Sequence, residues 1–401
     1  MITLREDDLR EDRFSRLRLI PWWDQTKVSA CRVLVVGAGA LGNEILKNLL
    51  LLGFRKIVIL DLDRIEESNL SRTILFRRRD IGKFKVHAAA EACREIEPDC
   101  EVTPLVGNVM EDCGLGVFEW SDLILAGLDN REARLWINRA AWKVGRPWID
   151  GAIEGINGVA RVFLPGQAPC YECTLGEVDW AILERRMSCN LLMHDPAPEG
   201  KVPTTPTISS IIAGIQVQEA MKLIHGLPVL ASRGFVFEGM NHSSYAVTYT
   251  ENPDCMSHYT IPSLIRLPGR SGDWTLEALR RRAQMDLQAE EVVLEFSRDI
   301  VQRLACATCG KVEDLYVPAS RLRYGQAKCP DDGQMRVVRT IHAYNGTESY
   351  GGRTLDQLGL PLFDVLVARS VVPGGEGREI GYLPEGDGRD VLGPLASGGE
   401  R

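Results

Sequence analysis

Long apolar runs are missing from this sequence of 401 residues. No stretch reaches the roughly 18 apolar residues that a membrane-spanning helix needs, and the leucine-rich run at 45–52 is broken by Lys47 and Asn48. The first residues, MITLREDDLREDRF, are charged and contain no hydrophobic segment, so we do not expect a secretory signal. An excess of positive charge is missing too. The formal net charge of −8 argues against nucleic acid as a main partner and against an anionic membrane.

The composition that remains is that of an ordinary soluble globular protein, with 45% hydrophobic and 25% charged residues. The length is sufficient for two or three domains. Eleven cysteines occur, several of them in C-x-x-C pairs inside an α/β chain. This usage is typical of metal ligands and free thiols in a reducing cytosol, so we expect a cytoplasmic protein.

The chain is organised around residues 33–44, VLVVGAGALGNE, in which four apolar β-formers run into G-x-G-x-x-G. The glycines are Gly37, Gly39 and Gly42. The order predicts a buried strand, a tight turn and a helix N-terminus, where the backbone can approach a phosphate group and free N–H groups favour its charge. A second predicted strand, 56–60, ends in Asp61, the position from which an acid usually binds ribose hydroxyls. The motif therefore predicts a nucleotide site.

The glycine motif alone also fits a dinucleotide redox cofactor. Beyond Asp61, however, Arg72 and Lys85 follow the second strand at spacings that a hydride-transfer enzyme does not need. A triphosphate does need such cations, because its charge must be neutralised while a phosphoanhydride is attacked. The alternative is a solvated basic face around residues 77–79.

Four further motifs occur in a fixed order. They are D-x-D at 61–63, S-N-L-x-R at 68–72, D-I-G-x-x-K at 80–85 and L-D-N at 128–130. As a set they resemble the ubiquitin-activating enzymes and their bacterial relatives, the MoeB and ThiF adenylyltransferases, over residues 10–260.

The resemblance implies roles for individual residues. Arg72 and Lys85 would hold ATP phosphates, and Asp129 would bind magnesium. The remaining site residues would be Asp61 and Asp63 at the ribose, with Asn69 also lining the site. Arg13 lies in an R-F-S-R element whose arginine, by resemblance, reaches an ATP site, in several family members that of the dimer partner. A solvated basic turn is the alternative for Arg13.

Strand and helix patterns alternate over residues 33–150, with a strand at 121–126, a helix at 131–144 and further sheet at 158–164. This alternation predicts an α/β, doubly wound, Rossmann-like domain. Asp129 would follow a strand at its carboxyl end, which is where such folds bind ligands.

The first C-x-x-C pair is Cys170 and Cys173, which alone could be redox-active, structural or accidental. In the family that the chain resembles, such a pair joins a second one in an N-P-x-C context to hold a structural zinc. Here the second pair is Cys255 and His258, and zinc accepts three thiolates and an imidazole. We therefore expect a structural zinc site, with a fortuitous pair of short spacings as the alternative.

Residues 177–205 form a crossover segment that precedes an I-A-G-I-Q-V-Q-E-A helix at 212–220. In ubiquitin-activating enzymes the thioester-forming cysteine lies in such a crossover, so the resemblance implies that Cys189 is the nucleophile. A thiolate attacks an acyl adenylate well once it is mildly activated, and Arg185 and Arg186 could lower the pKa of this thiol. The alternative is an inert buried cysteine.

Beyond residue 260 the pattern predicts a strand, a helix over 275–289 with Thr275 as N-cap, a strand over 291–296 and a last strand over 363–372. This order is similar to the ubiquitin-like fold that eukaryotic catalytic subunits carry at this end, where it recruits the conjugating enzyme. The expected domains are therefore an adenylation domain at 1–260, a smaller α+β ubiquitin-like domain at 261–372, and a flexible Gly- and charge-rich tail at 373–401.

A zinc-ribbon-like insert at 303–335 is expected inside the C-terminal domain. C-x-x-C-G at 306–310 and C-P-x-x-G at 329–333 are typical of zinc knuckles. The expected ligands are Cys306, Cys309, Cys329 and, where cysteine would be usual, Asp332. A fourth ligand at His342 and an empty ribbon are the alternatives.

Taken together, the resemblance implies ATP- and Mg²⁺-dependent adenylation of a ubiquitin-like protein, thioester formation on Cys189 and transfer to a conjugating enzyme, with Zn²⁺ as a structural metal. The sequence at 212–220 is close to that of the eukaryotic catalytic subunits. By the same resemblance, the compact chain implies a homodimer from a bacterial or archaeal organism. The nearest alternative is a sulfur-carrier adenylyltransferase for thiamine or molybdenum-cofactor synthesis, which needs no conjugating enzyme. Two more distant alternatives are a dinucleotide oxidoreductase and a module that only binds a ubiquitin-like partner.

Overall fold

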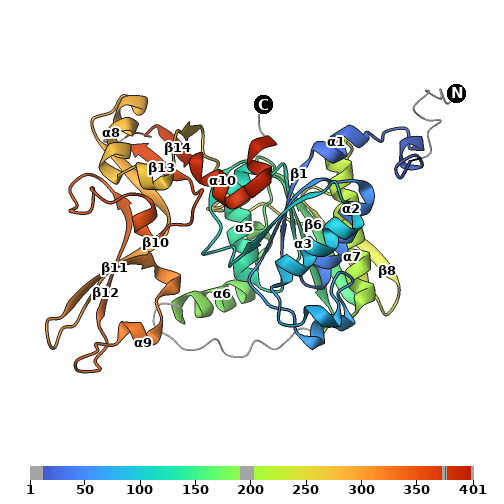
Figure 1. Ribbon diagram of the computed structural model, residues 1–401, viewed down its shortest axis with the longest axis horizontal. Helices are drawn as coiled ribbons and strands as arrows, with labels where there is room; N and C mark the ends of the chain where they lie inside the picture. The colour runs from blue at the N-terminus through green and yellow to red at the C-terminus, as the bar shows by residue number, and fades with distance from the viewer. Residues whose placement is uncertain (1–11, 190–202, 373–374, 376, 399–401) are drawn as a thin grey trace.

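The computed structural model describes residues 12–189, 203–372, 375 and 377–398, without the side chains of 184–189. Two β-sheets organise the chain, and Figure 1 shows them side by side, with the N-terminal segment and the second sheet at opposite ends of the molecule. None of the described helices is both long enough and apolar enough to cross a membrane.

The first sheet contains eight strands within the described residues, in the order β3-β2-β1-β4-β5-β6-β7-β8. The first five strands in this order, β3, β2, β1, β4 and β5, run parallel to one another. The strands β6, β7 and β8 extend the sheet with antiparallel pairing. Their bounds are β1 Arg32–Val36, β2 Lys56–Asp61, β3 Glu101–Val106, β4 Leu123–Ala126, β5 Trp148–Glu154, β6 Asn157–Phe163, β7 Arg233–Glu238 and β8 Ser243–Thr248.

Helices cover both faces of this sheet, because its central strands are apolar on both sides. Val33 and Val35 of β1 belong to a core shared with α2, α3 and α7, whereas Leu34 and Val36 belong to a second core shared with α4 and α5. The helices of this part are α1 Gln25–Ala30, α2 Ala40–Leu52, α3 Lys85–Ile96, α4 Leu115–Trp120, α5 Arg131–Lys143, α6 Glu177–Cys189 and α7 Pro206–Ile224. The predicted mixed α/β fold with a large parallel sheet is confirmed.

The strand order reverses at one place. From β1 the chain moves outward to β2 and β3, and then returns to β4 on the other side of β1. The loops that leave the carboxyl ends of β1 and β4 therefore diverge to opposite faces, which is the geometry that binds ligands in open α/β sheets. The glycine turn follows β1 and the L-D-N loop follows β4, so both lie at this switch point.

The second sheet is built around the long strand β10, with the order β11-β10-β13-β14-β9 and β12 on β10 as well. Its strands are β9 Leu264–Leu267, β10 Val292–Ala305, β11 Val312–Pro318, β12 Val337–Tyr344, β13 Leu366–Ser370 and β14 Glu379–Pro384. Its helices are α8 Leu276–Leu287, α9 Tyr324–Ala327 and α10 Gly386–Leu392. Thr275 caps α8 as predicted, because its hydroxyl oxygen accepts a hydrogen bond from the Ala278 amide at 3.1 Å.

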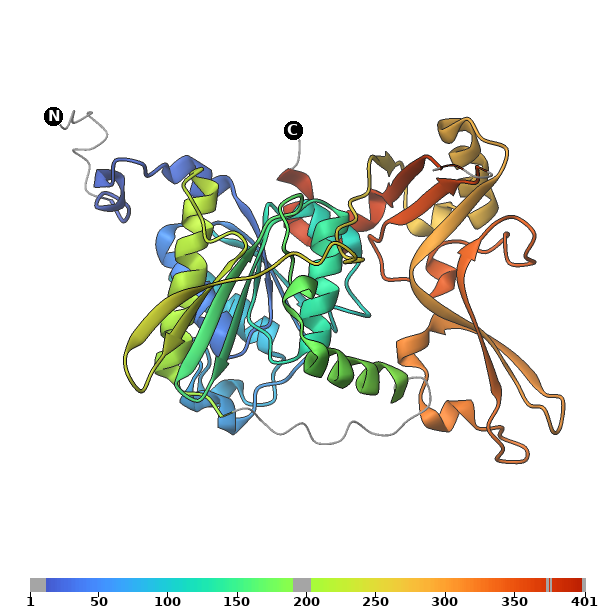
Figure 2. The same ribbon diagram turned by 180° about the vertical axis from the view of Figure 1, so that it is seen from behind.

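The strand β10 is longer than the predicted strand over 291–296, and its two parts pair with different strands. Its first part pairs with β13, and its last part, from Ile300, pairs with β11. The region formed by residues 300–344 projects from the second sheet, and we call it the arm (Figure 2).

The expectation of a flexible tail over 373–401 is wrong for much of that range. Among the described residues, β14 pairs with both β9 and β13, and α10 follows directly. Although the segment is rich in glycine and charged residues, it also contains apolar residues that the fold buries, and Tyr382 and Leu383 are fully buried. Leu392 then packs into the second core of the first sheet, and its carbonyl accepts a hydrogen bond from the Thr103 hydroxyl at 2.7 Å.

Candidate functional site

The glycine turn between β1 and α2 requires its glycines for different reasons. Gly37 has a φ of +93°, and a Cβ there would lie 2.5 Å from the carbonyl oxygen of Gly127. A Cβ at Gly42 would lie 1.9 Å from the carbonyl oxygen of Gly37, so this glycine lets α2 pack directly on the turn. A Cβ at Gly39 would meet nothing within 4 Å. The space above Gly39 is therefore open at the N-terminus of α2, where a phosphate group would bind.

Asp61, at the end of β2, connects the glycine turn to the loop that follows β2 through hydrogen bonds. One carboxylate oxygen accepts a hydrogen bond from the Ala38 amide at 2.7 Å, and the other accepts one from the Asp63 amide at 2.8 Å. Burial raises the pKa of the Asp61 carboxyl, although the charge of Lys85 acts in the opposite direction. The Lys85 ammonium lies 2.7 Å from the Asp63 carboxylate. The structure thus brings Asp61 into direct contact with the glycine turn and links Asp63 and Lys85 to the turn through Asp61.

Asn69 and Arg72 lie between β2 and α3, at a 3₁₀ helix formed by Glu67–Ser71. The Asn69 side chain accepts a hydrogen bond from the Glu66 amide at 2.9 Å, and the half-buried Arg72 donates to the Ser68 carbonyl at 2.7 Å. Both of these predicted residues are therefore held by contacts within their own loop.

Asn43 was not predicted as a site residue, yet it joins this loop to the glycine turn. Its amide nitrogen donates to the Ala38 carbonyl at 2.8 Å, and its amide oxygen accepts from the Leu75 amide at 2.9 Å. The side chain is fully buried. A buried asparagine just after a G-x-G-x-x-G motif was the available signal, since its polar atoms need partners.

Asp129 is exposed in the loop after β4, and the groups that position this loop come from elsewhere in the chain. Asn130 caps α5 by accepting a hydrogen bond from the Ala133 amide at 2.7 Å. Arg134, one turn into α5, donates to the carbonyl oxygens of Leu128 and, at 3.1 Å, Gly151. The Gln216 side chain of α7 donates to the Ala126 carbonyl at 2.8 Å.

Arg134 belongs to a buried ion cluster with Asp150 and Arg161. The Arg134 guanidinium lies 2.8 Å from the Asp150 carboxylate, which also pairs with Arg161. Burial alone would raise the pKa of Asp150, but the two guanidinium charges hold it below its ordinary value. The carboxylate is therefore ionised and fixes Arg134 beneath the L-D-N loop. Sequence reasoning missed this cluster because its members are separated along the chain.

Arg13 lies at the opposite end of α2 from the glycine turn. Its guanidinium donates to the Glu97 carboxylate at 2.9 Å, to the Ile96 carbonyl at 2.8 Å and to the Leu50 carbonyl at 3.4 Å. A helix of this length separates its ends by about 20 Å. Within one chain, therefore, Arg13 is not brought together with Lys85 and Asp61.

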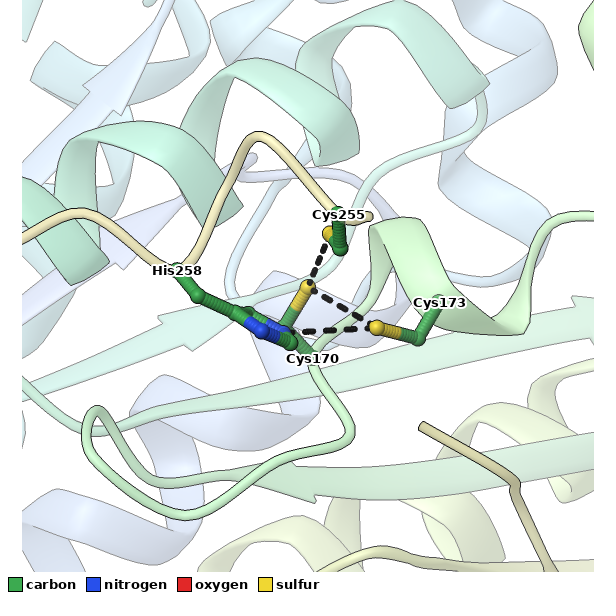
Figure 3. A group of neighbouring side chains, drawn as sticks. All are labelled: Cys170, Cys173, Cys255 and His258. Atoms are coloured by element: carbon green, nitrogen blue, oxygen red, sulfur yellow. Dashed lines mark hydrogen bonds between the residues drawn. The ribbon is translucent and has the colours of Figure 1, made fainter. Parts of the chain in front are cut away.

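The expected zinc ligands of the first cluster lie together, as Figure 3 shows. The Cys170 sulfur lies 3.8 Å from that of Cys173 and 3.6 Å from that of Cys255, and the Cys173 sulfur lies 3.3 Å from Nε2 of His258. All four ligand atoms are within 4.8 Å of one another. Three sulfurs and one imidazole at these separations could hold a tetrahedral zinc ion.

The surroundings of His258 also suit a metal ligand. The other ring nitrogen, Nδ1, lies 3.8 Å from the Glu251 carboxylate, a partner of the kind that fixes the tautomer of a ligating histidine. The ring stacks on Trp142 with a centroid separation of 4.6 Å. The second expected cluster, Cys306, Cys309, Cys329 and Asp332, also has its ligand atoms within 4.8 Å of one another.

Cys189 is the last residue of α6, but its side chain lies outside the described residues, as do those of Arg185 and Arg186. After the segment 190–202, the described chain resumes at Pro203, whose carbonyl accepts a hydrogen bond from the Gly155 amide at 2.7 Å. Thr204 then bridges to Gly155, and Thr205 caps α7. The prediction that Cys189 is a nucleophile therefore stays a prediction.

The sheet order, the glycine turn and the loops at the switch point define a Rossmann-like α/β protein with a nucleotide-type site. The sequence model of the ThiF family matches residues 12–257, and the chain belongs to that family. The resemblance to the ubiquitin-activating and MoeB–ThiF family is thereby confirmed, and with it the coarse class of an ATP-using enzyme of the adenylyltransferase type.

Curated relatives carry more specific names. The chain is 43% identical over 164 residues to the Nedd8-activating enzyme E1 catalytic subunit of Drosophila melanogaster, covering 38% of this chain and 36% of that protein. It is 37% identical over 157 residues to SUMO-activating enzyme subunit uba-2 of Caenorhabditis elegans, covering 38% of this chain and 27% of that protein. The chain thus spans about a third of the length of the curated relatives it matches.

Solved structures show the same fold at low sequence identity. Escherichia coli MccB with ATP has a TM-score of 0.51 and 20% identity, covering 62% of this chain and 74% of that one. MccB with MccA-N7isoASN has a TM-score of 0.52 and 19% identity, covering 62% of this chain and 76% of that one.

Proposed function

We propose that this chain adenylates the C-terminal carboxylate of a ubiquitin-like protein, with ATP bound over the glycine turn. The convergence of three loops at the switch point carries the proposal. The glycine turn touches the L-D-N loop through Gly37 and Gly127, and Asp61 joins the same turn to Asp63 and Lys85. The curated relatives named as Nedd8- and SUMO-activating subunits support the choice of a ubiquitin-like substrate.

Different residues of the chain would bind the phosphates and the ribose of ATP. The open space over Gly39, with the amides at the N-terminus of α2, receives phosphate oxygens. The Asp61 carboxylate uses two of its about four acceptor sites on backbone amides, which leaves the others for ribose hydroxyls. Lys85 and Arg72 neutralise phosphate charge, and Lys85 is pre-positioned by its ion pair with Asp63.

In the first step a carboxylate oxygen of the substrate attacks the α-phosphorus, the bond to the bridging oxygen breaks, and pyrophosphate leaves. Asp129, exposed above β4, is the residue that would hold magnesium, which supplies positive charge to the phosphates when bound. Arg134 holds the backbone of this loop in place through the Leu128 carbonyl. Arg13 would complete the site of a second copy of the chain in a homodimer.

In the second step the Cys189 thiolate attacks the acyl carbon, AMP leaves, and a thioester forms for transfer to a conjugating enzyme docked on the second sheet domain. The order of strand, helix and strands in that domain supports a ubiquitin-like docking module. A sulfur-carrier adenylyltransferase is the second candidate, because the ThiF family match covers the ATP site and the chain spans only about a third of the activating subunits.

The first step is tested by ATP–pyrophosphate exchange with candidate ubiquitin-like proteins. Lys85→Ala should lower the exchange rate by about 10²–10³-fold, the usual effect of removing a group that stabilises developing charge. Lys83→Ala is the matched control, because Lys83 lies two residues away but pairs with the buried Asp80 and the exposed Glu91. Equal rates for both variants, or exchange that no ubiquitin-like protein stimulates, would contradict the proposal.

The second step is tested on non-reducing gels with ATP, magnesium and the same proteins. A thiol-sensitive adduct in the wild type that disappears, or becomes a thiol-resistant ester, in Cys189→Ser supports thioester transfer. Exchange without any adduct in either protein supports the sulfur-carrier candidate instead.

A further inference from the structure

The arm has a small apolar core of its own. Within the described residues this core consists of Val301, Leu304, Leu322 and Ala327, with Leu315, Val317, Ala319 and Val338 partly buried against it. Units below about 40 residues usually need disulfides, metals or oligomerisation to be stable, and the arm is only slightly longer than that limit. Every described cysteine is free, so no disulfide supports the arm. A metal ion at the tip would supply such support.

Two turns at the tip of the arm share one backbone geometry. In the first, the Cys306 amide donates to the Lys311 carbonyl at 2.8 Å, and the Gly310 amide donates to the Cys306 carbonyl at 3.0 Å. In the second, the Cys329 amide donates to the Gln334 carbonyl at 2.7 Å, and the Gly333 amide donates to the Cys329 carbonyl at 2.9 Å.

The glycines of these turns have matching conformations, with φ of +74° at Gly310 and +70° at Gly333. The two turns are therefore equivalent residue by residue. In this equivalence Asp332 occupies the position that Cys309 occupies in the first turn. The contacts agree, since the Asp332 carboxylate lies 3.2 Å from the Cys306 sulfur, and the sulfurs of Cys309 and Cys329 lie 3.5 Å apart.

The same geometry places His342 away from the tip. His342 lies on β12 between Ile341, which pairs with Ile300, and Ala343, which pairs with Glu295. The tip is reached where Val337 pairs with Ala305. Five residues of strand separate these positions by about 17 Å, which is far beyond the reach of an imidazole.

We propose that the arm holds a second zinc ion, coordinated by the sulfurs of Cys306, Cys309 and Cys329 and by the carboxylate of Asp332. Zinc fits because it accepts thiolate and carboxylate ligands in a tetrahedron. This centre differs from the one at Cys170 in two respects. One ligand is a hard oxygen, and both Cys309 and Asp332 are exposed. The arm centre therefore exchanges its metal faster than the centre at Cys170, where Cys170 is buried and the other three ligands are half-buried.

The test counts and times metal in the full-length chain. After dialysis against a weak chelator, elemental analysis should find two zinc ions per wild-type chain and one in Cys329→Ser. Zinc release to a chromogenic chelator should be biphasic, and Asp332→Ala should speed the faster phase by about tenfold or more, because changes even outside the ligand set cost at least that much affinity. Asp332→Cys should slow the same phase.

Asp331→Ala is the matched control, since this neighbouring carboxylate pairs with Lys311 at 3.1 Å and is not one of the clustered ligand groups. It should keep two zinc ions and the wild-type release rate. His342→Ala should do the same. One zinc per wild-type chain, a bound metal other than zinc, or equal release from Asp332→Ala and Asp331→Ala would overturn the proposal.

Discussion

The guanidinium of Arg134 lies 2.8 Å from the carboxylate of Asp150, and both side chains are buried beneath the loop that carries Asp129. Arg134 also donates to the Leu128 carbonyl, so a charge pair inside the domain fixes the backbone of a surface loop. The magnesium-binding role proposed for Asp129 would need such support, because an exposed loop has little packing of its own.

Arg134→Met should therefore lower ATP–pyrophosphate exchange by about tenfold or more through lost positioning of Asp129. Unfolding free energy should fall by about 1–3 kcal/mol, because Arg161 remains beside Asp150 but the hydrogen bonds to the Asn130, Leu128 and Gly151 carbonyls are lost. Raising the magnesium concentration should restore part of the rate in this variant, which a merely structural defect would not allow. Arg131 is on the same helix as Arg134 but pairs near the surface with Asp179 of α6, so Arg131→Met should leave both quantities near wild type.

Two glycines of the same turn should respond differently to alanine. Gly42→Ala places a methyl group against the Gly37 carbonyl and should lower the unfolding free energy by about 1–3 kcal/mol, as overpacking does. Gly39→Ala meets open space and should change stability by less than about 0.5 kcal/mol. It should nevertheless weaken ATP binding, because its methyl group enters the phosphate space. Unchanged ATP affinity in a fully folded Gly39→Ala protein would place the phosphates elsewhere.

A pH effect is expected at Glu277, at the start of α8. Hydrogen bonds from Arg280, Tyr344 and Arg281 lower the pKa of its carboxyl to about 2. A lowered carboxyl pKa stabilises the folded chain above the unfolded pKa, near about 4.3, and this stability is lost as pH falls toward the folded value. Glu277→Gln should therefore be less stable than wild type at pH 7 by at most about 1 kcal/mol.

Chemical denaturation of the two proteins across this pH range checks the sign. Their stabilities should converge as pH falls from about 4.3 toward 2. Glu290→Gln, an exposed position beyond the same helix, serves as the control. A difference that grows toward acid would contradict the assignment.

Arg13 offers a test of the proposed homodimer. Because it lies at the far end of α2 from its own glycine turn, an Arg13→Ala chain should be able to complement a Lys85→Ala chain. Mixing the two inactive proteins would give one dimer site with both residues intact and one with neither. Exchange activity should then return to about a quarter of wild type when subunits mix at random. No recovery after verified subunit mixing would mean that Arg13 serves only its pair with Glu97.

The sequence predicted those parts of the fold that are encoded locally. The strand, glycine turn and helix at 33–52 follow from apolar runs and glycine spacing. Thr275, a typical N-cap residue, predicted where the next domain's first long helix begins. The grouping of the two sets of possible metal ligands was predictable because cysteine pairs are rare and their spacings are diagnostic. In each of these cases the signal lies within a few residues of the feature.

The rest depends on contacts between distant segments. Arg134, Asp150 and Gln216 meet beneath the L-D-N loop from three separate elements, and nothing in their own neighbourhoods marks them. The position of Arg13 follows from packing against Glu97. The C-terminal segment was misjudged because its glycines and charges suggested mobility, whereas Tyr382 and Leu383 are buried.

The burial of Leu392 and Leu395 in the second core of the first sheet has a consequence for the folding pathway. The face of the sheet covered by α4 and α5 stays partly open until these two side chains dock on it. Contacts between segments so far apart along the chain form slowly, because the chain between them must first be closed into a loop. A folding intermediate in which the first sheet is formed but these side chains are not yet docked is therefore expected to expose apolar surface and to be a target for chaperones and proteases.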